Sequence, residues 1–298
     1  MSIRTSAVIC VLSACLTASG LVAMARADRI FATNLGSVHE YDESGQLVRT
    51  YSPATIRNAA GIAVDSRGNV YIGQASTVWR YRPGNDIPEA FASLSYPVDI
   101  EVASDDTLFV SDFTEGSISH FDQDGNLLAT PLVNQVNLTG IDIDSNGNLL
   151  AYVRDSSGGG TVERITPAGD FLQSIKVNTA PNFLALDDVD NIYVQGGKGD
   201  MIDRFLPDGT YAGIYLSDVA MPFGLDFDSA GRLYVAQYVG PVRRYNTDGS
   251  LDDSFSLPVS GFNVYVHRGV SVPEPNTGLL AIFGVGVMLR KFRGIAAR

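Results

Sequence analysis

The sequence has little cysteine, histidine or tryptophan. Its 298 residues include two Cys, three His and one Trp. Both cysteines, Cys10 and Cys15, lie close to the N-terminus. The remainder of the chain therefore cannot form a disulfide, a thiolate nucleophile or a cysteine-ligated metal site. If the N-terminal segment is removed, the folded part depends on its hydrophobic core alone for stability.

Basic residues are also scarce, and they are unevenly distributed. The chain has 21 Lys and Arg against 33 Asp and Glu, a net charge of −12. Between Asp28 and Ser271 there are only 15 basic residues against 32 acidic ones, a net charge of −17. This balance argues against a nucleic acid partner. It is consistent with solubility outside the cell and with cation binding.

The first 27 residues have the pattern of a secretory signal peptide. Ser6–Ala25 carries no charge and is followed by Ala25-Arg26-Ala27, in which small residues Ala25 and Ala27 flank a cleavage site. We therefore predict that residues 1–27 are removed and that Asp28 is the first mature residue. Two alternatives stay open. The uncharged stretch is nearly long enough for an uncleaved membrane anchor, and Leu12–Cys15 resembles a bacterial lipobox, in which the cysteine would be lipidated and become the N-terminus.

The last 27 residues also have a recognisable order. A Val272-Pro273-Glu274-Pro275 spacer precedes an uncharged stretch whose apolar part, Gly278–Leu289, is short for a membrane-spanning helix. A basic cluster of Arg290, Lys291 and Arg293 follows, which we expect to stay on the cytoplasmic side. This order resembles the PEP-CTERM sorting signal. The resemblance implies a short hydrophobic helix that anchors the chain in the membrane until an exosortase processes residues 272–298. The alternative is a plain tail anchor.

The body of the chain, residues 28–271, is an internal repeat. Three strong copies of one phrase occupy Gly61–Ile72, Gly140–Ala151 and Gly224–Val235, and two weaker copies occupy Asp99–Val110 and Phe183–Val194. Successive copies are about 40 residues apart, and each unit contains alternating apolar residues separated by turn residues such as Asp, Asn and Gly. Each unit is therefore predicted to form four antiparallel strands.

Repeats of this length and content predict an all-β fold, a six-bladed β-propeller of four-stranded blades. The first unit begins near Asp28 and lacks its innermost strand. We expect the C-terminal strand at Gly261–His267 to supply it, which closes the ring without an open sheet edge. The repeats resemble the NHL type, and this resemblance is specific for fold but not for activity.

The repeat brings polar residues to the centre of the ring. Glu101, Asp142 and Asp226 occupy one equivalent position of the innermost strand and are predicted to face the central channel. Further candidates lie where inner strands begin or second strands end, at the predicted mouth of the channel: Asp99, Asp112, Asn182, Asn34, Gln74 and Gln237. These oxygen ligands suit Ca²⁺ or another divalent cation. The simpler alternative is that Asp is a common, solvated filler of this repeat position.

The histidines do not support a catalytic centre. His39 and His120 fall in outer strands of different units, and His267 falls in the last strand. A histidine zinc site, a Ser-His-Asp triad or a pair of catalytic histidines is therefore not expected.

Two functions follow from these features. The repeat and the sorting tail favour an exported binding or scaffold protein of the cell surface or exopolysaccharide matrix, with exosortase-type machinery, polysaccharide or matrix proteins as partners. The alternative is a metal-dependent hydrolase or lactonase, because gluconolactonase and regucalcin-like propellers resemble this fold and bind a divalent metal through Glu, Asn and Asp. Their motifs cannot be matched position by position, so no catalytic residue is assigned.

Overall fold

The computed structural model describes residues 26–34, 36–51, 61–130, 132–133, 135, 137–155, 159–177, 182–196 and 199–271. Ala27–Val270 form one compact unit. The predicted C-terminal helix and sorting tail, residues 272–298, lie outside the described residues, as does the predicted signal peptide up to Ala25 with both cysteines. Among the residues that are described, no helix has the length and apolar character needed to cross a membrane.

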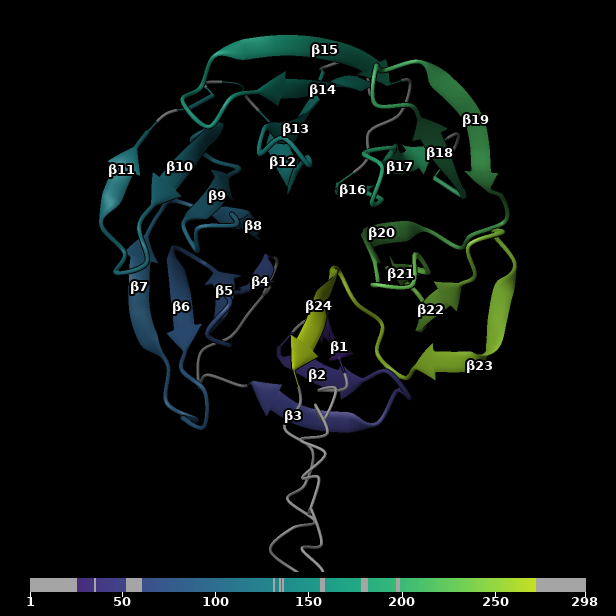
Figure 1. The fold of residues 1–298 in the computed structure, drawn as a ribbon, viewed down its shortest axis with the longest axis horizontal. Coiled ribbons are helices and arrows are strands. Elements are labelled where there is room, and N and C mark those ends of the chain that lie inside the picture. Colours follow the sequence, from purple (N-terminus) through teal and green to yellow (C-terminus); the bar gives the residue numbers. More distant parts are fainter. Residues whose placement is uncertain are drawn as a thin grey trace, which may run out of the picture. The chain divides into compact units, whose positions relative to one another are not determined.

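The described strands form six four-stranded antiparallel sheets arranged as the blades of a propeller (Figure 1). Blades one to three, each written from the axis outward, are β24 (Val264–Ser271), β1 (Arg26–Thr33), β2 (Val38–Asp42) and β3 (Leu47–Tyr51); β4 (Ile62–Val64), β5 (Val70–Gln74), β6 (Thr77–Tyr81) and β7 (Glu89–Ser93); β8 (Pro97–Val102), β9 (Leu108–Asp112), β10 (Ser117–Phe121) and β11 (Leu127–Ala129). Blades four to six are β12 (Leu138–Ile143), β13 (Leu149–Arg154), β14 (Gly160–Ile165) and β15 (Phe171–Val177); β16 (Leu184–Leu186), β17 (Ile192–Gly196), β18 (Met201–Phe205) and β19 (Tyr211–Leu216); β20 (Pro222–Phe227), β21 (Leu233–Gln237), β22 (Val242–Tyr245) and β23 (Leu251–Leu257). The predicted fold is therefore confirmed.

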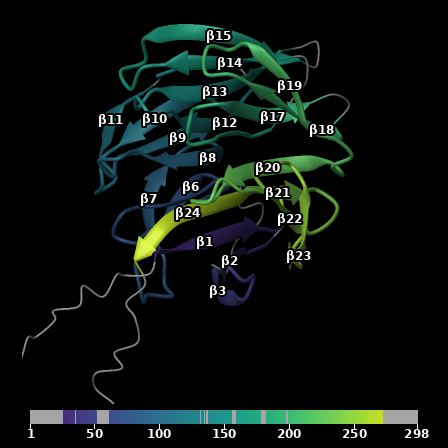
Figure 2. The ribbon, with the colours of Figure 1, turned by 45° about the vertical axis from the view of Figure 1, so that its right-hand side comes forward.

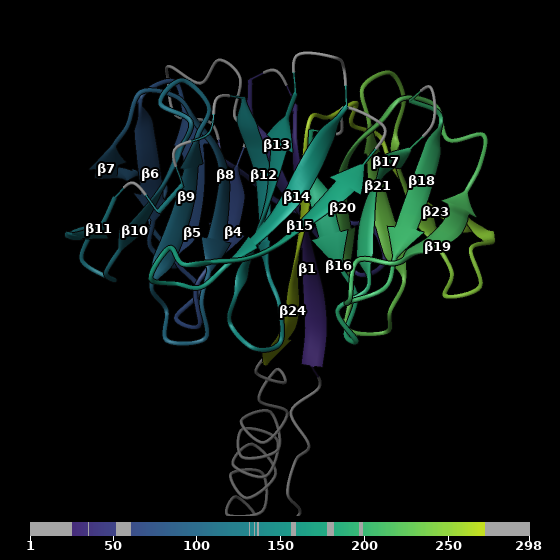
Figure 3. The same cartoon turned by 90° about the horizontal axis from the view of Figure 1, so that it is seen from above.

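The ring is closed by the two ends of the propeller, as predicted. The C-terminal strand β24 is the innermost strand of blade one and pairs with β1, and the two strands lie side by side in all three views (Figures 1, 2 and 3). The Thr33 amide donates to the Asn263 carbonyl at 3.0 Å at one end of this pair. Strand β24 runs to Ser271, beyond the predicted end at His267, and β1 begins at Arg26, two residues before the predicted mature N-terminus.

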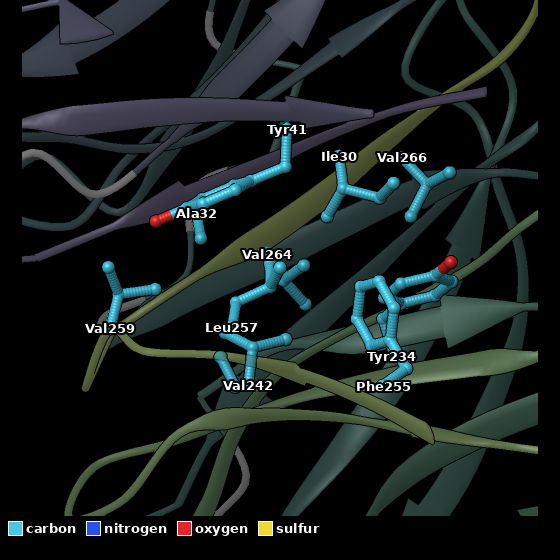
Figure 4. Packing of buried hydrophobic residues seen from close by; sticks show 11 residues of the cluster. Ile30, Ala32, Tyr41, Tyr234, Val242, Phe255, Leu257, Val259, Val264 and Val266 are labelled. Carbon is cyan, nitrogen blue, oxygen red and sulfur yellow. The ribbon is translucent and has the colours of Figure 1, made fainter. Parts of the chain in front are cut away.

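The hydrophobic core is divided among the blade interfaces. The buried hydrophobic side chains of the described residues form six clusters, each between two adjacent blades. The cluster between blades six and one joins Ile30 and Tyr41 to Tyr234 and Phe255 (Figure 4). The Tyr234 and Phe255 rings meet edge to face, with centroids 5.3 Å apart. Stability therefore comes from six similar faces, and every blade needs both of its neighbours.

The turn between the first and second strands of a blade explains the Asp in the repeated phrase. Asp65 Oδ1 accepts hydrogen bonds from the backbone N–H groups of Arg67 and Asn69 at 3.0 and 2.8 Å. The same pattern occurs at the equivalent residues Asp144, Asp187 and Asp228. A carboxylate that binds the backbone two and four residues on stabilises this turn.

The Ser after that Asp links one blade to the next. Ser145 in blade four donates from its backbone N–H and its hydroxyl to Asp190 in blade five, at 2.8 and 2.6 Å. Ser66 makes the same two bonds to Asp106 between blades two and three. Such bonds hold neighbouring turns together at the end of the ring opposite the predicted mouth.

Candidate functional site

A central cavity of about 600 Å³ lies between the innermost strands, and all six of these strands contribute to its lining. Figure 1 shows the six strands around the axis. The structure brings four sequence-predicted residues into this one cavity: Asp99, Glu101, Asp142 and Asp226. Its other charged lining residues are Asp144, Asp187, Asp188, Asp190 and Arg268. The cavity is thus strongly acidic.

Asp142 and Asp226 bind backbone N–H groups on the free edges of innermost strands. Each innermost strand pairs with only one neighbour. Alternate backbone N–H groups on the free edge then have no partner within the sheet. Asp142 Oδ1 accepts from the Ile143 amide and Oδ2 from the Leu186 amide of the next blade, both at 2.7 Å. Asp226 binds Phe227 at 2.7 Å and Val266 of blade one at 2.6 Å. Each carboxylate therefore links two innermost strands.

Asp99 makes the same kind of link. It lies on β8 two residues before Glu101, and therefore closer to the mouth. Its Oδ1 accepts from the Ile100 amide at 3.1 Å, and its Oδ2 accepts from the Ile141 amide of blade four at 3.0 Å. The Ser111 hydroxyl, beside it in the sheet, donates to the Thr139 carbonyl at 2.8 Å. Blades three and four are therefore joined at the cavity wall by a carboxylate and a hydroxyl.

These carboxyl groups are held away from bulk water and close to one another. Burial raises the pKa of Asp99 to about 8, against the lowering effect of its two backbone hydrogen bonds and with a further rise from the Asp142 charge. Burial and the Asp226 charge raise the pKa of Asp142 to about 7. Burial also raises the pKa of Asp226, although the Arg268 charge opposes it. The cavity therefore retains protons near neutral pH.

Glu101 differs from the three aspartates. Its side chain lines the same cavity, but none of the described residues donates a hydrogen bond to it. Burial first, and then the charges of Asp142, Asp99 and Asp226, raise the pKa of Glu101 well above its usual range. Among the described residues that line the cavity, Glu101 is therefore the carboxyl group that accepts no hydrogen bond.

Arg268 balances only part of the negative charge. It lies on β24, where Nε donates to the Phe227 carbonyl at 2.7 Å and Nη1 to Asp188 at 2.9 Å. Its Nη2 lies 3.5 Å from Asp226 Oδ1. The guanidinium is thus held by blades five and six, at the end of the cavity formed by the inner turns.

The other sequence-predicted mouth residues do not line the cavity. Asp112 is buried and accepts backbone N–H bonds from Ser95 and Thr114 at 2.6 and 3.0 Å. Asn34 Oδ1 accepts the Ser37 amide at 2.8 Å, and Asn182 Oδ1 accepts from an Arg154 nitrogen at 3.2 Å. Gln74 and Gln237 are buried at the ends of β5 and β21. The hydrogen bonds of Asp112, Asn34 and Asn182 organise the loops around the mouth.

The cavity carboxylates do not fit a divalent metal well. Three of the four accept two backbone N–H bonds each, one on each oxygen, and these bonds direct the carboxylates towards the strands. Across the described residues, no three His, Cys, Asp or Glu side chains are grouped so that they could hold a metal ion. The calcium site at Glu101, Asp142 and Asp226 therefore stays a prediction.

Sequence reasoning missed a cluster of aromatic side chains at the mouth. Phe183 lines the cavity and lies 6.1 Å, between ring centroids, from Phe223. Phe223 lies 6.0 Å from Tyr238 and 5.6 Å from Phe262. Each of these residues stands at the start of an innermost strand or just after a second strand. That position, already singled out for its polar residues, was the signal that could have found them.

Comparisons with known proteins support the fold alone. No protein-family model matches the chain, and no curated protein matches its sequence. Among solved structures, a protein of unknown function from Bacteroides caccae has a TM-score of 0.61 and 14% identity over 81% of this chain and 99% of that one. A gluconolactonase from Xanthomonas campestris has a TM-score of 0.58 and 18% identity over 71% and 83% of the two chains, and a streptogramin B lyase has 0.55 and 15% over 78% and 74%.

Proposed function

We propose that this protein is an exported β-propeller that binds a partner of the cell surface or extracellular matrix and does not catalyse a reaction on it. The observation that carries the proposal is the set of exposed aromatic side chains at the mouth. Tyr96, Phe113 and Tyr238 are 37%, 38% and 48% exposed. Exposed aromatic groups gathered at one end of a fold are typical of binding surfaces.

The hydrogen bonds of the cavity carboxylates also support binding over catalysis. Asp99, Asp142 and Asp226 each accept two backbone N–H groups. Each carboxylate uses two of its roughly four lone-pair sites in these bonds. The bonds join neighbouring blades, which gives the three residues a structural role.

The location follows from the two ends of the sequence. Residues 1–27 have the pattern of an export signal, and residues 272–298 that of a tail handled by exosortase-type machinery. In this proposal the C-terminal segment holds the chain in the membrane before processing. The partner is then exopolysaccharide or another matrix component, and the acidic body keeps the protein soluble outside the cell.

Fractionation of the native cells tests the location, and retention on their exopolysaccharide tests the function. We expect the protein in the envelope or matrix fraction, without its C-terminal peptide, and retained on immobilised exopolysaccharide. Recovery of the intact C-terminal peptide from secreted material would contradict tail processing. Recovery in the cytoplasm, or no retention on any matrix fraction, would contradict the proposed function.

The rival function, a metal-dependent lactonase or hydrolase, needs a direct control. Lactone hydrolysis that rises with added Ca²⁺ or Mn²⁺ and is lost in Glu101→Ala would favour it. We expect no such activity. We also expect the melting temperature of the wild-type protein and of a Glu101→Ala, Asp142→Ala, Asp226→Ala triple variant to be insensitive to calcium.

A further inference from the structure

A second cavity lies away from the axis, among the outer strands of blades two and three, which are neighbours in the ring (Figure 1). We call it the side groove. Its volume is about 670 Å³, within the range of about 300–1,000 Å³ that ligand sites occupy. The end of β7 contributes to one wall, and β10 and β11 contribute to the other. Ten residues line the groove, and five of them carry a hydroxyl group: Ser93, Ser95, Ser117, Ser119 and Thr130.

The groove lies where one strand of blade three carries small side chains. Ser117, Ser119 and Phe121 alternate along β10 and therefore share one face. That face is directed at blade two, because the Phe121 ring lies 6.1 Å from the Phe91 ring of β7. Ser119 pairs with Val110 of β9. At the same register the other five blades carry larger side chains: His39, Trp79, Glu163, Asp203 and Arg243. Serine leaves space between the blades.

Hydroxyl groups of the groove retain hydrogen-bonding capacity. Ser117 is only 8% exposed, and its hydroxyl binds none of the described residues. Ser119 Oγ lies 3.0 Å from Thr130 Oγ1, and this pair keeps further donor and acceptor capacity. Buried polar groups are normally paired, and leaving one unpaired is unfavourable. A ligand with its own hydroxyl groups would supply the missing partner of Ser117.

A carboxylate and two aromatic rings stand at the mouth end of the groove. Glu115 is exposed, and its Oε1 accepts the Ser95 hydroxyl at 2.6 Å, which leaves Oε2 free to accept from a ligand. Tyr96 directly follows Ser95, and Phe113 directly follows Asp112, another lining residue. The Phe113 amide donates to the Tyr96 carbonyl at 3.0 Å, and the two exposed rings lie 6.3 Å apart.

We propose that the side groove binds a neutral glycan. Sugar hydroxyl groups donate to Glu115 and exchange hydrogen bonds with Ser117 and the other hydroxyl groups of the walls. The apolar face of a sugar ring packs on Leu127, and the chain leaves the groove beside Tyr96 and Phe113. This inference rests on the proposed binding function, and it names the site and the chemistry of the partner.

The lining favours a neutral sugar over a charged one. The charged side chains among the described residues that line the groove are Asp112 and Glu115, and neither has a basic neighbour in that lining. Acidic sugars are therefore repelled. Asp112 is buried and accepts four backbone N–H groups, so it shapes the wall. Leu127 is 53% exposed and supplies an apolar surface. Hydroxyl groups beside an apolar patch match the polar edge and apolar face of a pyranose.

The backbone along the groove argues against an extended peptide. A peptide that adds to a sheet needs free N–H and C=O groups on the edge strand. Beyond the short strand β11, the edge of β10 is already bonded. The Leu132 amide donates to the Ile118 carbonyl at 3.0 Å, and the Gln135 amide donates to the Gly116 carbonyl at 2.8 Å. This wall therefore offers side-chain hydroxyl groups to a ligand, as a glycan requires.

Affinity electrophoresis through native gels tests the inference. We expect the purified exported protein to be retarded by at least one of dextran, galactomannan and xyloglucan, which are neutral, and not by alginate, a polyanion. Ser119→Trp gives blade three the residue that blade two carries at this register, and it should weaken binding at least tenfold. Glu115→Ala, at an exposed residue, should weaken binding about threefold or more. Ser256→Trp, at an exposed serine of β23, is the matched control and should bind normally.

Three results would overturn the side groove as a neutral glycan site. The first is no retardation by any of the three neutral polysaccharides, and the second is equal retardation by alginate. The third is normal binding by Ser119→Trp with a melting temperature near that of the wild-type protein. If Ser119→Trp does not fold, normal binding by Glu115→Ala overturns the site instead.

Retention on the native exopolysaccharide separates this inference from the function on which it rests. If the wild-type protein and folded Ser119→Trp are retained equally, the binding function stands and its site lies elsewhere. If the wild-type protein is not retained on any matrix fraction, the proposed function fails even where a neutral polysaccharide binds in the side groove. Binding of a matrix protein that is lost in Ser119→Trp, with no polysaccharide bound, overturns the glycan.

Discussion

Gly224 lies so close to Asn263 that a Cβ atom on Gly224 would fall 2.6 Å from the Asn263 Cα. The first glycines of the other two strong repeat copies are in the same position. A Cβ on Gly61 would lie 2.8 Å from the Asp99 Cα, and one on Gly140 would lie 2.6 Å from the Phe183 Cα. Each strong copy therefore begins with glycine because the innermost strand of the next blade crosses it closely.

Gly224→Ala is expected to lower the free energy of unfolding by about 1–3 kcal/mol, because the new methyl group meets backbone and the two strands must separate. Chemical denaturation of the purified protein measures the change. Gly73→Ala is the milder control, because its Cβ would lie 3.3 Å from the nearest atom, the Pro97 carbonyl oxygen. Equal stability of the wild-type protein and Gly224→Ala would contradict this explanation of the repeat glycine.

The fold could be predicted from the sequence because its signals are local and repeated. Turn residues such as Asp65 recur at a fixed place in four of the six units, and the missing first strand left a gap that Val264–Ser271 fills. The hydrogen bonds between neighbouring blades could not be predicted. They join residues far apart in the sequence, such as Ser145 and Asp190, which are 45 positions apart.

Ser145 and Asp190 are expected to be energetically coupled. In a double-mutant cycle of Ser145→Ala and Asp190→Asn, the coupling energy should be about 0.5–1.5 kcal/mol, the typical contribution of such hydrogen bonds. Asparagine suits position 190, because Asp190 has a φ of 63° and asparagine tolerates that region. The equivalent cycle at Ser66 and Asp106 should give a similar coupling energy. Additive effects at both pairs would show that these bonds do not join the blades.

The stability of the propeller should fall as the pH rises, because of the cavity carboxyls. A carboxyl group whose pKa is higher in the folded state than in the unfolded state stabilises the fold at low pH, and this contribution is lost as the pH rises through the folded-state pKa. For Asp99 and Asp142 the loss extends from about pH 4, the unfolded-state pKa, to about 8 and 7. The contribution of Glu101 to stability also falls as the pH rises, because its pKa is raised in the folded state.

Glu101→Gln tests this dependence without removing a hydrogen bond. At pH 4.5 the variant and the wild-type protein should be about equally stable. At pH 8 the variant should be more stable by about 1 kcal/mol or more, since a pKa shift of one unit corresponds to about 1.4 kcal/mol. Urea unfolding at both pH values measures the difference. Asp253→Asn, at an exposed residue of β23, should leave the pH dependence unchanged, and a Glu101→Gln variant no more stable than wild type at pH 8 would contradict the prediction.

Only part of the site could be predicted from the sequence. The repeat places Glu101, Asp142 and Asp226 at one inward-facing position, and all three line the cavity. Whether an aspartate there is free or bound to the next blade depends on the distance between strands, which composition does not encode. Asp226 binds the Val266 amide at 2.6 Å, whereas Glu101 has a longer side chain and binds no backbone donor of the described residues.

The predicted cleavage after Ala27 has a structural consequence at Asp28. The Asp28 nitrogen lies 2.7 Å from Glu43 Oε1, and the Asp28 carboxylate accepts the backbone N–H groups of Ser229 and Gly269 at 2.8 and 2.7 Å. Cleavage would convert this nitrogen into an ammonium group, and its hydrogen bond to Glu43 into an ion pair. Glu43→Gln should therefore destabilise the mature protein more than the uncleaved precursor, by about 0.5–1 kcal/mol.

Two measurements check this prediction, and each tests a different part of it. N-terminal sequencing of the exported protein should begin at Asp28, and a lipidated Cys15 terminus would contradict the cleavage site. Thermal unfolding of the precursor and the mature chain, each with and without Glu43→Gln, then isolates the ion pair. If cleavage occurs after Ala27 but the two forms lose equal stability, the new ammonium does not pair with Glu43. The Asp28 carboxylate would still bind blades six and one through the Ser229 and Gly269 amides.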